Sequence, residues 1–109
     1  MNRRAARTDD NQKEIVAAFE MCGLSVALLH RAGEGFPDLV VGYGGLSGLV
    51  EVKDGDKPPS ARKLTKKQIQ FREEWRGDYT VIKDTDEAIA FAEYFRDRAN
   101  RLMVGEKNA

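Results

Sequence analysis

The sequence predicts an α/β fold, in which a central mixed β-sheet of about four strands is flanked by helices. Two observations lead to this prediction. Helical apolar stripes alternate with short runs rich in valine, isoleucine and leucine, and the segments follow the order α-β-β-β-α-β-α. The 109 residues fit one compact domain. We therefore expect a single domain over residues 1–109, with residues 1–10 and 103–109 flexible at its ends.

The first half of the chain predicts one helix and then three strands. The helix runs from Asn11 to Met21, with an apolar stripe formed by Ile15, Ala18, Phe19 and Cys22. Its start is capped by one of three polar residues, Asp9, Asp10 or Asn11. Three β runs follow at residues 24–30, 38–44 and 48–54. The last two form an antiparallel hairpin around a glycine-rich turn at residues 43–48.

The second half predicts a loop, a helix, a strand and a long helix. Two prolines argue against regular structure at residues 55–64. A helix begins at Thr65 and ends at Gly77, and Thr65 with Gln68 fits a capping box. A strand follows at residues 79–83. The last helix begins at Asp84, where Glu87 repeats the capping-box spacing. Its apolar stripe is formed by Ala88, Phe91, Ala92, Phe95, Ala99 and Leu102.

Composition excludes several classes of protein. Eighteen basic residues balance eighteen acidic ones, so net charge alone does not indicate nucleic-acid binding. One cysteine and one histidine argue against a disulfide framework or structural zinc. No apolar run approaches the roughly 20 residues that a membrane span needs, and no secretory signal is evident. We expect a cytoplasmic protein, inside a bacterial or phage-infected cell, with no membrane partner.

The predicted strand at residues 48–54 carries charge on one face. Because side chains alternate along a strand, Glu51 and Lys53 share a face while Val50 and Val52 point the other way. Asp38 begins the preceding strand. In an antiparallel hairpin the start of one strand lies beside the end of the next, so we expect Asp38 near Glu51 and Lys53.

Two carboxylates and a lysine at one strand end suit metal-assisted phosphodiester chemistry. Mg²⁺ prefers hard oxygen ligands, which Asp38, Glu51 and the backbone carbonyl of Val52 can supply. A metal there polarises the phosphodiester and activates water. Lys53 then orients that water, holds the scissile phosphate or acts as general base, and these roles stay open at the level of sequence.

The pattern Pro37-Asp38 … Glu51-Val52-Lys53 resembles the signature of the PD-(D/E)xK nuclease superfamily. With the first helix and the segments "GFPDLVV", "LVEVKDG" and "LTKKQIQF", about residues 12–90 resemble the virus-type replication-repair nuclease (VRR-NUC) domain. The resemblance implies a restriction-endonuclease-like core and Mg²⁺- or Mn²⁺-dependent cleavage of DNA. It implies metal binding by Glu14, Asp38 and Glu51, a catalytic Lys53, and a Gln68 that helps to order the site.

The resemblance also suggests partners. Small members of the family are similar to dimeric Holliday junction resolvases, so we expect a homodimer that cuts branched DNA such as four-way junctions, in replication, repair or recombination. Five basic residues close to Lys53 in sequence form the expected phosphate-binding rim, in a nuclease without a small-molecule cofactor. They are Lys57, Arg62, Lys63, Lys66 and Lys67.

Simpler interpretations compete with these. Glu51 and Lys53 can form an ordinary exposed ion pair on an edge strand. Glu14 can be a solvated acid in the first turn of its helix, and Gln68 can serve only as a helix cap. At the level of function, the alternatives are a non-catalytic DNA-binding or assembly module with a relic nuclease site, and an RNA nuclease.

Overall fold

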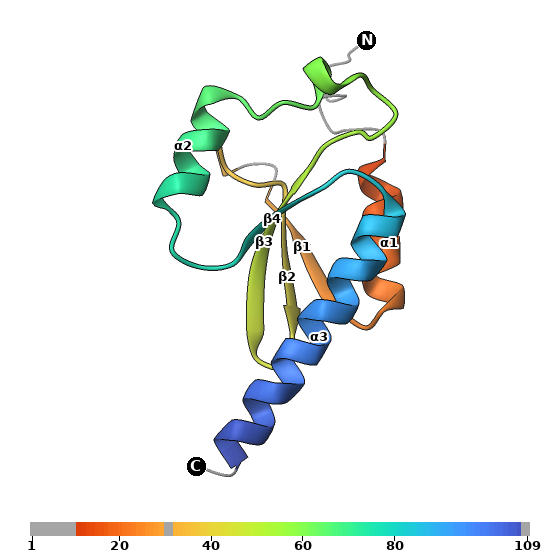
Figure 1. Cartoon of the computed structure of the whole chain (residues 1–109), viewed down its shortest axis with the longest axis vertical. Coiled ribbons are helices and arrows are strands. Elements are labelled where there is room, and N and C mark those ends of the chain that lie inside the picture. Colours follow the sequence, from red (N-terminus) through yellow and green to blue (C-terminus); the bar gives the residue numbers. More distant parts are fainter. Residues whose placement is uncertain (1–10, 30–31, 108–109) are drawn as a thin grey trace.

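The predicted order of helices and strands is present in the structure, a computed structural model that describes residues 11–29 and 32–107 (Figure 1). Its elements are α1 (Gln12–Met21), β1 (Ser25–Leu28), β2 (Leu39–Tyr43), β3 (Leu46–Val52), the 3₁₀ turn η2 (Pro59–Ala61), α2 (Lys66–Glu74), β4 (Tyr79–Ile82) and α3 (Thr85–Lys107). The expectation for residues 1–10, 108 and 109 lies outside the described residues.

The four strands form one mixed sheet in the order β1-β2-β3-β4. The pairs β1–β2 and β2–β3 are antiparallel, whereas β3–β4 is parallel. The β2–β3 turn is shorter than expected, because Leu46 and Ser47 already belong to β3. Only Gly44 and Gly45 remain in the turn, both with positive φ (58° and 84°), which suits a tight hairpin connection.

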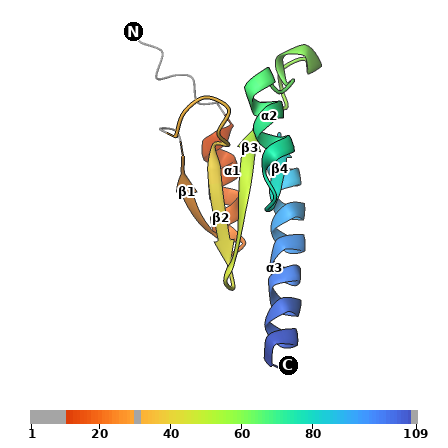
Figure 2. The same cartoon turned by 90° about the vertical axis from the view of Figure 1, so that its left-hand side faces the viewer.

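One face of the sheet carries the hydrophobic core. Figures 1 and 2 show α1 and α3 packed together against this face. The most deeply buried apolar side chains come from both helices and the two central strands: Ile15, Phe19, Leu39, Val41, Val50, Val52, Ala92 and Phe95. Six of these eight were predicted from the helical stripes and from the alternation in β3, and the other two, Leu39 and Val41, belong to the predicted β2 run. Local periodicity therefore identifies this core.

The long helix α3 differs from its prediction at its C-terminal end. It runs to Lys107, so the described part of the tail expected to be flexible is helical. The predicted apolar stripe is buried at Ala88, Ala92, Phe95 and Ala99, whereas Leu102 at its end is 56% exposed. The reason is geometric: Figure 1 shows that α3 continues past the end of the strands, where no sheet covers it.

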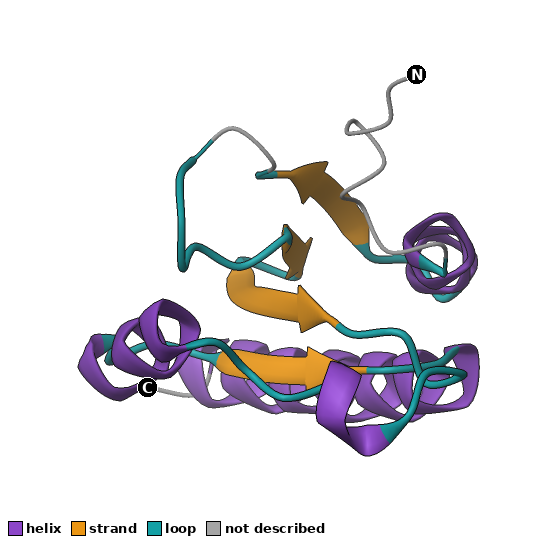
Figure 3. Cartoon of the chain, turned by 90° about the horizontal axis from the view of Figure 1, so that it is seen from above, coloured by secondary structure: helices purple, strands orange, loops and turns teal. Residues whose placement is uncertain are grey.

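The opposite face of the sheet carries α2. Glu51 points away from the core, as its alternation with Val50 and Val52 requires, and its side chain contacts Gln68 of α2. Seen from above, α2 and α1 lie on opposite sides of the strands (Figure 3). The glycine at position 35 helps to bring these parts together. A Cβ there would lie 2.9 Å from the carbonyl oxygen of Lys67, so only glycine lets this loop pack on α2.

The segment between β3 and α2 corrects one expectation. Its prolines were expected to exclude regular structure, yet Pro59–Ala61 forms a 3₁₀ turn. Pro59 stands at the start of this turn. Proline lacks a backbone N–H, but at the first position of a helix this group has no acceptor within the helix, so its absence costs nothing. The prolines therefore begin a short helical turn and do not prevent it.

Candidate active site

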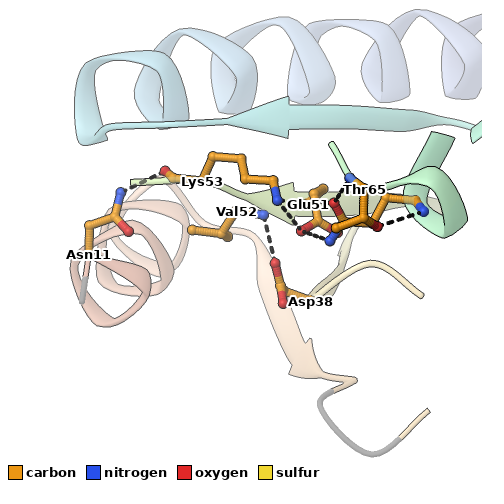
Figure 4. Close-up of polar contacts among 7 residues, drawn as sticks. Asn11, Asp38, Glu51, Val52, Lys53 and Thr65 are labelled. Carbon is orange, nitrogen blue, oxygen red and sulfur yellow. Dashed lines mark hydrogen bonds and ion pairs between the residues drawn. The ribbon is translucent and has the colours of Figure 1, made fainter. Parts of the chain in front are cut away.

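The register of the β2–β3 hairpin places Asp38 next to Glu51. Leu39 pairs with Val50, so the residue before Leu39 lies opposite the residue after Val50. The Asp38 backbone N–H donates to the Val50 carbonyl (3.1 Å), and Asp38 Oδ2 accepts from the Val52 N–H (2.8 Å). The carboxylate of Asp38 therefore extends the ladder by one step and is held against the end of β3 (Figure 4). This neighbourhood was predicted from the hairpin alone.

Glu51 is a buried carboxylate, with 3% of its side chain exposed. Its Oε2 accepts a hydrogen bond from Gln68 Nε2 (3.0 Å) and lies 3.9 Å from Lys53 Nζ. Lys53 is itself only 14% exposed, and its Nζ donates to Gln68 Oε1 (3.0 Å). Glu51 and Lys53 are therefore not the exposed surface pair that the simpler interpretation required. They form a buried network with one amide between them.

Gln68 caps its helix and orders the site at the same time. Its Oε1 accepts from the Thr65 N–H (2.9 Å), while Thr65 Oγ1 accepts from the Gln68 N–H (3.2 Å), which completes the predicted capping box. The same Oε1 also accepts from Lys53, and Nε2 is left to donate to Glu51. The two roles that competed at the level of sequence are thus compatible, because an amide has two distinct ends.

The backbone carbonyl of Val52 lies on the β2 side of β3. The N–H and C=O of one strand residue face the same neighbouring strand, and Val52 directs its N–H at Asp38. Since β2 begins only at Leu39, the Val52 carbonyl faces the region beyond the first residue of β2. Its apolar side chain, buried in the core, fixes this orientation.

Sequence patterns did not indicate the role of Asn11. It stands at the N-cap position of α1, as one of the predicted alternatives, but its side chain does not cap that helix. Instead Nδ2 donates to the carbonyls of Lys53 (3.0 Å) and Lys83 (2.8 Å), as Figure 4 shows for Lys53. Asn11 therefore links the start of α1 to the residues that directly follow β3 and β4.

Tyr79 is the second residue that sequence patterns missed. Its hydroxyl oxygen is buried and has no hydrogen-bond partner among the described residues. Burial first, and then the negative charge of Glu51, raise its pKa to about 12; Arg72 opposes this shift and Asp38 adds to it. Tyr79 is therefore a neutral phenol at neutral pH, close to both carboxylates. It can donate a hydrogen bond there but cannot act as a base.

Glu14 lies apart from the other predicted ligands. It is exposed in the first turn of α1 and lines a hollow of about 230 Å³ with Asn11, Asp54, Gly55, Asp56, Lys83, Asp84 and Thr85. Across residues 11–29 and 32–107, no group of three or more His, Cys, Asp or Glu side chains is arranged to hold a metal ion. The structure thus brings together Asp38, Glu51, Val52, Lys53 and Gln68, whereas Glu14 lines a separate hollow.

The basic residues expected to form the rim divide into three groups. Lys57, Lys63 and Lys66 are exposed, and Lys67, also exposed, pairs with Glu34 at 2.5 Å. Arg62 is partly buried and lines a hollow with Lys53.

The capping box expected at the start of α3 forms only in part. Asp84 Oδ1 accepts from the Glu87 N–H (2.8 Å), as predicted. The Glu87 carboxylate, however, accepts from the N–H and Nζ of Lys83 and not from the N–H of Asp84. Glu87 of α3 therefore holds both the backbone N–H and the side chain of Lys83.

No family model, curated protein or solved structure matches this chain. In the part of the chain that the structure describes, no helix is both long enough and apolar enough to cross a membrane.

Proposed function

We propose that this protein is a Mg²⁺-dependent endonuclease that hydrolyses phosphodiester bonds in DNA, with a restriction-endonuclease-like core. The observation that supports this most strongly is the buried Glu51 carboxylate, held by Gln68 and Lys53 and placed opposite Asp38 by the strand register. Buried charge is costly, and a fold that gathers it at a rigid strand end is typical of a chemical site.

The oxygen ligands suit a hard divalent cation. Two carboxylates, Asp38 and Glu51, lie at adjacent strand positions, and the Val52 carbonyl faces the same region. One or two carboxylates, completed by water and by substrate phosphate, are what Mg²⁺ commonly takes from a protein, and Mn²⁺ accepts similar ligands. When bound, the metal would polarise the phosphodiester and offset the charge that develops on it. Glu14 stays a predicted ligand from the resemblance alone.

The remaining side chains of the network, Lys53 and Gln68, position the groups around Glu51. Lys53 directs its ammonium to the region beside Glu51, where it can hold the attacking water or the scissile phosphate. Gln68 fixes both Glu51 and Lys53 from a helix whose own start it caps. Tyr79, neutral and buried beside them, offers a further donor. The exposed lysines of the rim then contact the phosphates of the DNA backbone, and these contacts do not depend on the DNA sequence.

We further propose that the protein acts as a homodimer on branched DNA. A monomer of 109 residues covers little duplex, and two sites related by a two-fold axis suit a symmetric four-way junction. Incubation with single-stranded, duplex, flap and four-way-junction DNA, and with matched RNA, tests the choice of substrate. Light scattering at the same concentrations tests the dimer.

The alternative function is a non-catalytic DNA-binding or assembly module with a relic site. One observation favours it: Glu51, Lys53 and Gln68 already bind one another, so this network can also serve structure alone.

Calorimetric titration with Mn²⁺ separates the two functions. If the protein is a nuclease, we expect saturable Mn²⁺ binding. Its affinity should fall about 10- to 100-fold in Asp38→Asn and in Glu51→Gln, because each substitution removes one negatively charged ligand. Glu93→Gln, the same chemical change at an exposed position on α3, is the matched control. Intact DNA binding without any metal binding would favour the module.

A further inference from the structure

A second hollow lies on the other side of Lys53, away from Asp38. It has a volume of about 230 Å³ and is lined by Lys53, Arg62, Val81, Lys83 and Glu87. Lys53 directly follows β3, and Lys83 directly follows β4, its parallel neighbour. The two strand ends are joined by the hydrogen bond from the Lys53 N–H to the Ile82 carbonyl. Asp38 lies on the β2 side of β3 and this hollow on the β4 side, so Lys53 stands between them.

The hollow carries an excess of positive charge. Three basic side chains line it against one acidic side chain, and that acid, Glu87, is bound to Lys83. Arg62 and Lys83 line the same hollow. The Glu87 hydrogen bond raises the pKa of Lys83, and the Arg62 charge opposes part of that rise.

Arg62, which lines this hollow, carries a buried hydrogen-bond donor that the described residues leave without an acceptor. Its Nε is buried, and among the described residues it has no acceptor. A buried donor without a partner is costly, and for a charged group more so. The guanidinium fork matches the paired oxygens of a phosphate, so a bound phosphate supplies the acceptor that the described chain does not.

We propose that this hollow is a phosphate-binding subsite, formed by Arg62, Lys83 and Lys53. Its ligand is a phosphate group, and on the proposed nuclease function this is a backbone phosphate close to the scissile one. Lys53 contributes to both sites and so fixes their spacing. Lys83, which no sequence pattern selected, becomes a substrate-binding residue, and Arg62 acts inside a built site and not on an exposed rim.

The first experiment uses inorganic phosphate and does not depend on cleavage. The arginine Nε–Hε NMR resonance of Arg62 is followed during titration with phosphate at constant ionic strength. We expect a saturable shift in the wild-type protein, about tenfold weaker affinity in Lys83→Gln, and no change in Arg101→Gln, which removes a cation from the far end of α3. Saturation that is equal in Lys83→Gln, or a shift that chloride reproduces, would overturn the subsite.

The second experiment identifies the source of the phosphate. DNA substrates carry a neutral methylphosphonate at one of the phosphates on either side of the cut. We expect one of these positions to slow cleavage by the wild-type protein about tenfold, and to have no further effect in Lys83→Gln. Sensitivity that Lys83→Gln leaves unchanged would show that the hollow does not hold the DNA backbone.

The two experiments test the phosphate subsite and the nuclease function independently. A protein that binds phosphate at Arg62 but cleaves no nucleic acid would retain the subsite and lose the proposed function. A protein that cleaves DNA without a phosphate-dependent shift at Arg62 would retain the function and lose the subsite. Circular dichroism first establishes that Lys83→Gln and Arg62→Gln are folded; Lys83→Gln alone can decide the proposal.

Discussion

Glu51 illustrates how the surroundings of a residue hold a carboxylate in a buried position. Its side chain is 3% exposed, although it alternates with valines in a strand. The amide of Gln68 and the ammonium of Lys53 stabilise the charge there, and Asp38 across the hairpin brings in a second carboxylate.

Tyr79 gives a prediction about pH. Because burial and Glu51 raise its pKa to about 12, the phenol should stay protonated well above pH 10 while the chain is folded. The difference in absorbance at 295 nm between the wild-type protein and Tyr79→Phe isolates its titration. Between the ordinary pKa of about 10 and the raised value the unfolded state binds fewer protons, so this tyrosine makes stability fall as pH rises.

The folded state is monitored by circular dichroism in the same samples. A Tyr79 titration with a midpoint near pH 10, in protein that is still folded, would contradict the buried position of this hydroxyl.

Residues differ in how far the sequence reveals their role. Asp38, Glu51 and Lys53 follow from strand alternation and from one hairpin, both of which are local. Asn11 and Tyr79 could not be found in this way. Asn11 contacts carbonyls 42 and 72 residues away, and Tyr79 reaches the site through the parallel register of β4. Neither relation leaves a periodic signal.

At the scale of elements, α2 connects helix stability to the site. Its capping box is visible in the sequence as Thr65 with Gln68, but the outward reach of the same glutamine to Glu51 depends on how α2 docks on the sheet. The docking depends in turn on the close approach of the loop at Gly35 to Lys67. Sequence spacing therefore predicted where the helix starts, whereas the contact of Gln68 with Glu51 depends on tertiary packing.

A pair of variants separates these two roles. Thr65→Ala removes one capping bond and leaves the Gln68 side chain in place, so unfolding free energy should fall by about 1 kcal/mol while cleavage stays within about twofold. Gln68→Leu removes the reciprocal cap and both site contacts. It should destabilise to a similar or greater extent and slow cleavage about 10- to 100-fold.

Urea denaturation and single-turnover rates measure the two effects. If Thr65→Ala slows cleavage as much as Gln68→Leu does, Gln68 acts only through the stability of its helix.

Over the whole molecule, the sheet separates the hydrophobic core from the proposed active site. Val50 and Val52 face α1 and α3 in the core, while Glu51 and Lys53 face α2 on the other side. The α/β class and the element order were predictable because they depend on local periodicity. The length of α3 beyond the sheet was not, since an apolar stripe at Leu102 looks the same whether or not a sheet covers it.

The most direct test of the proposed function is single-turnover cleavage of four-way-junction and duplex DNA with Mg²⁺. The proposal predicts metal-dependent cleavage that falls about 10²- to 10⁴-fold in both Glu51→Gln and Lys53→Met, with Glu93→Gln unchanged. Cleavage that persists in both Glu51→Gln and Lys53→Met, at the rate of the wild-type protein, would contradict it.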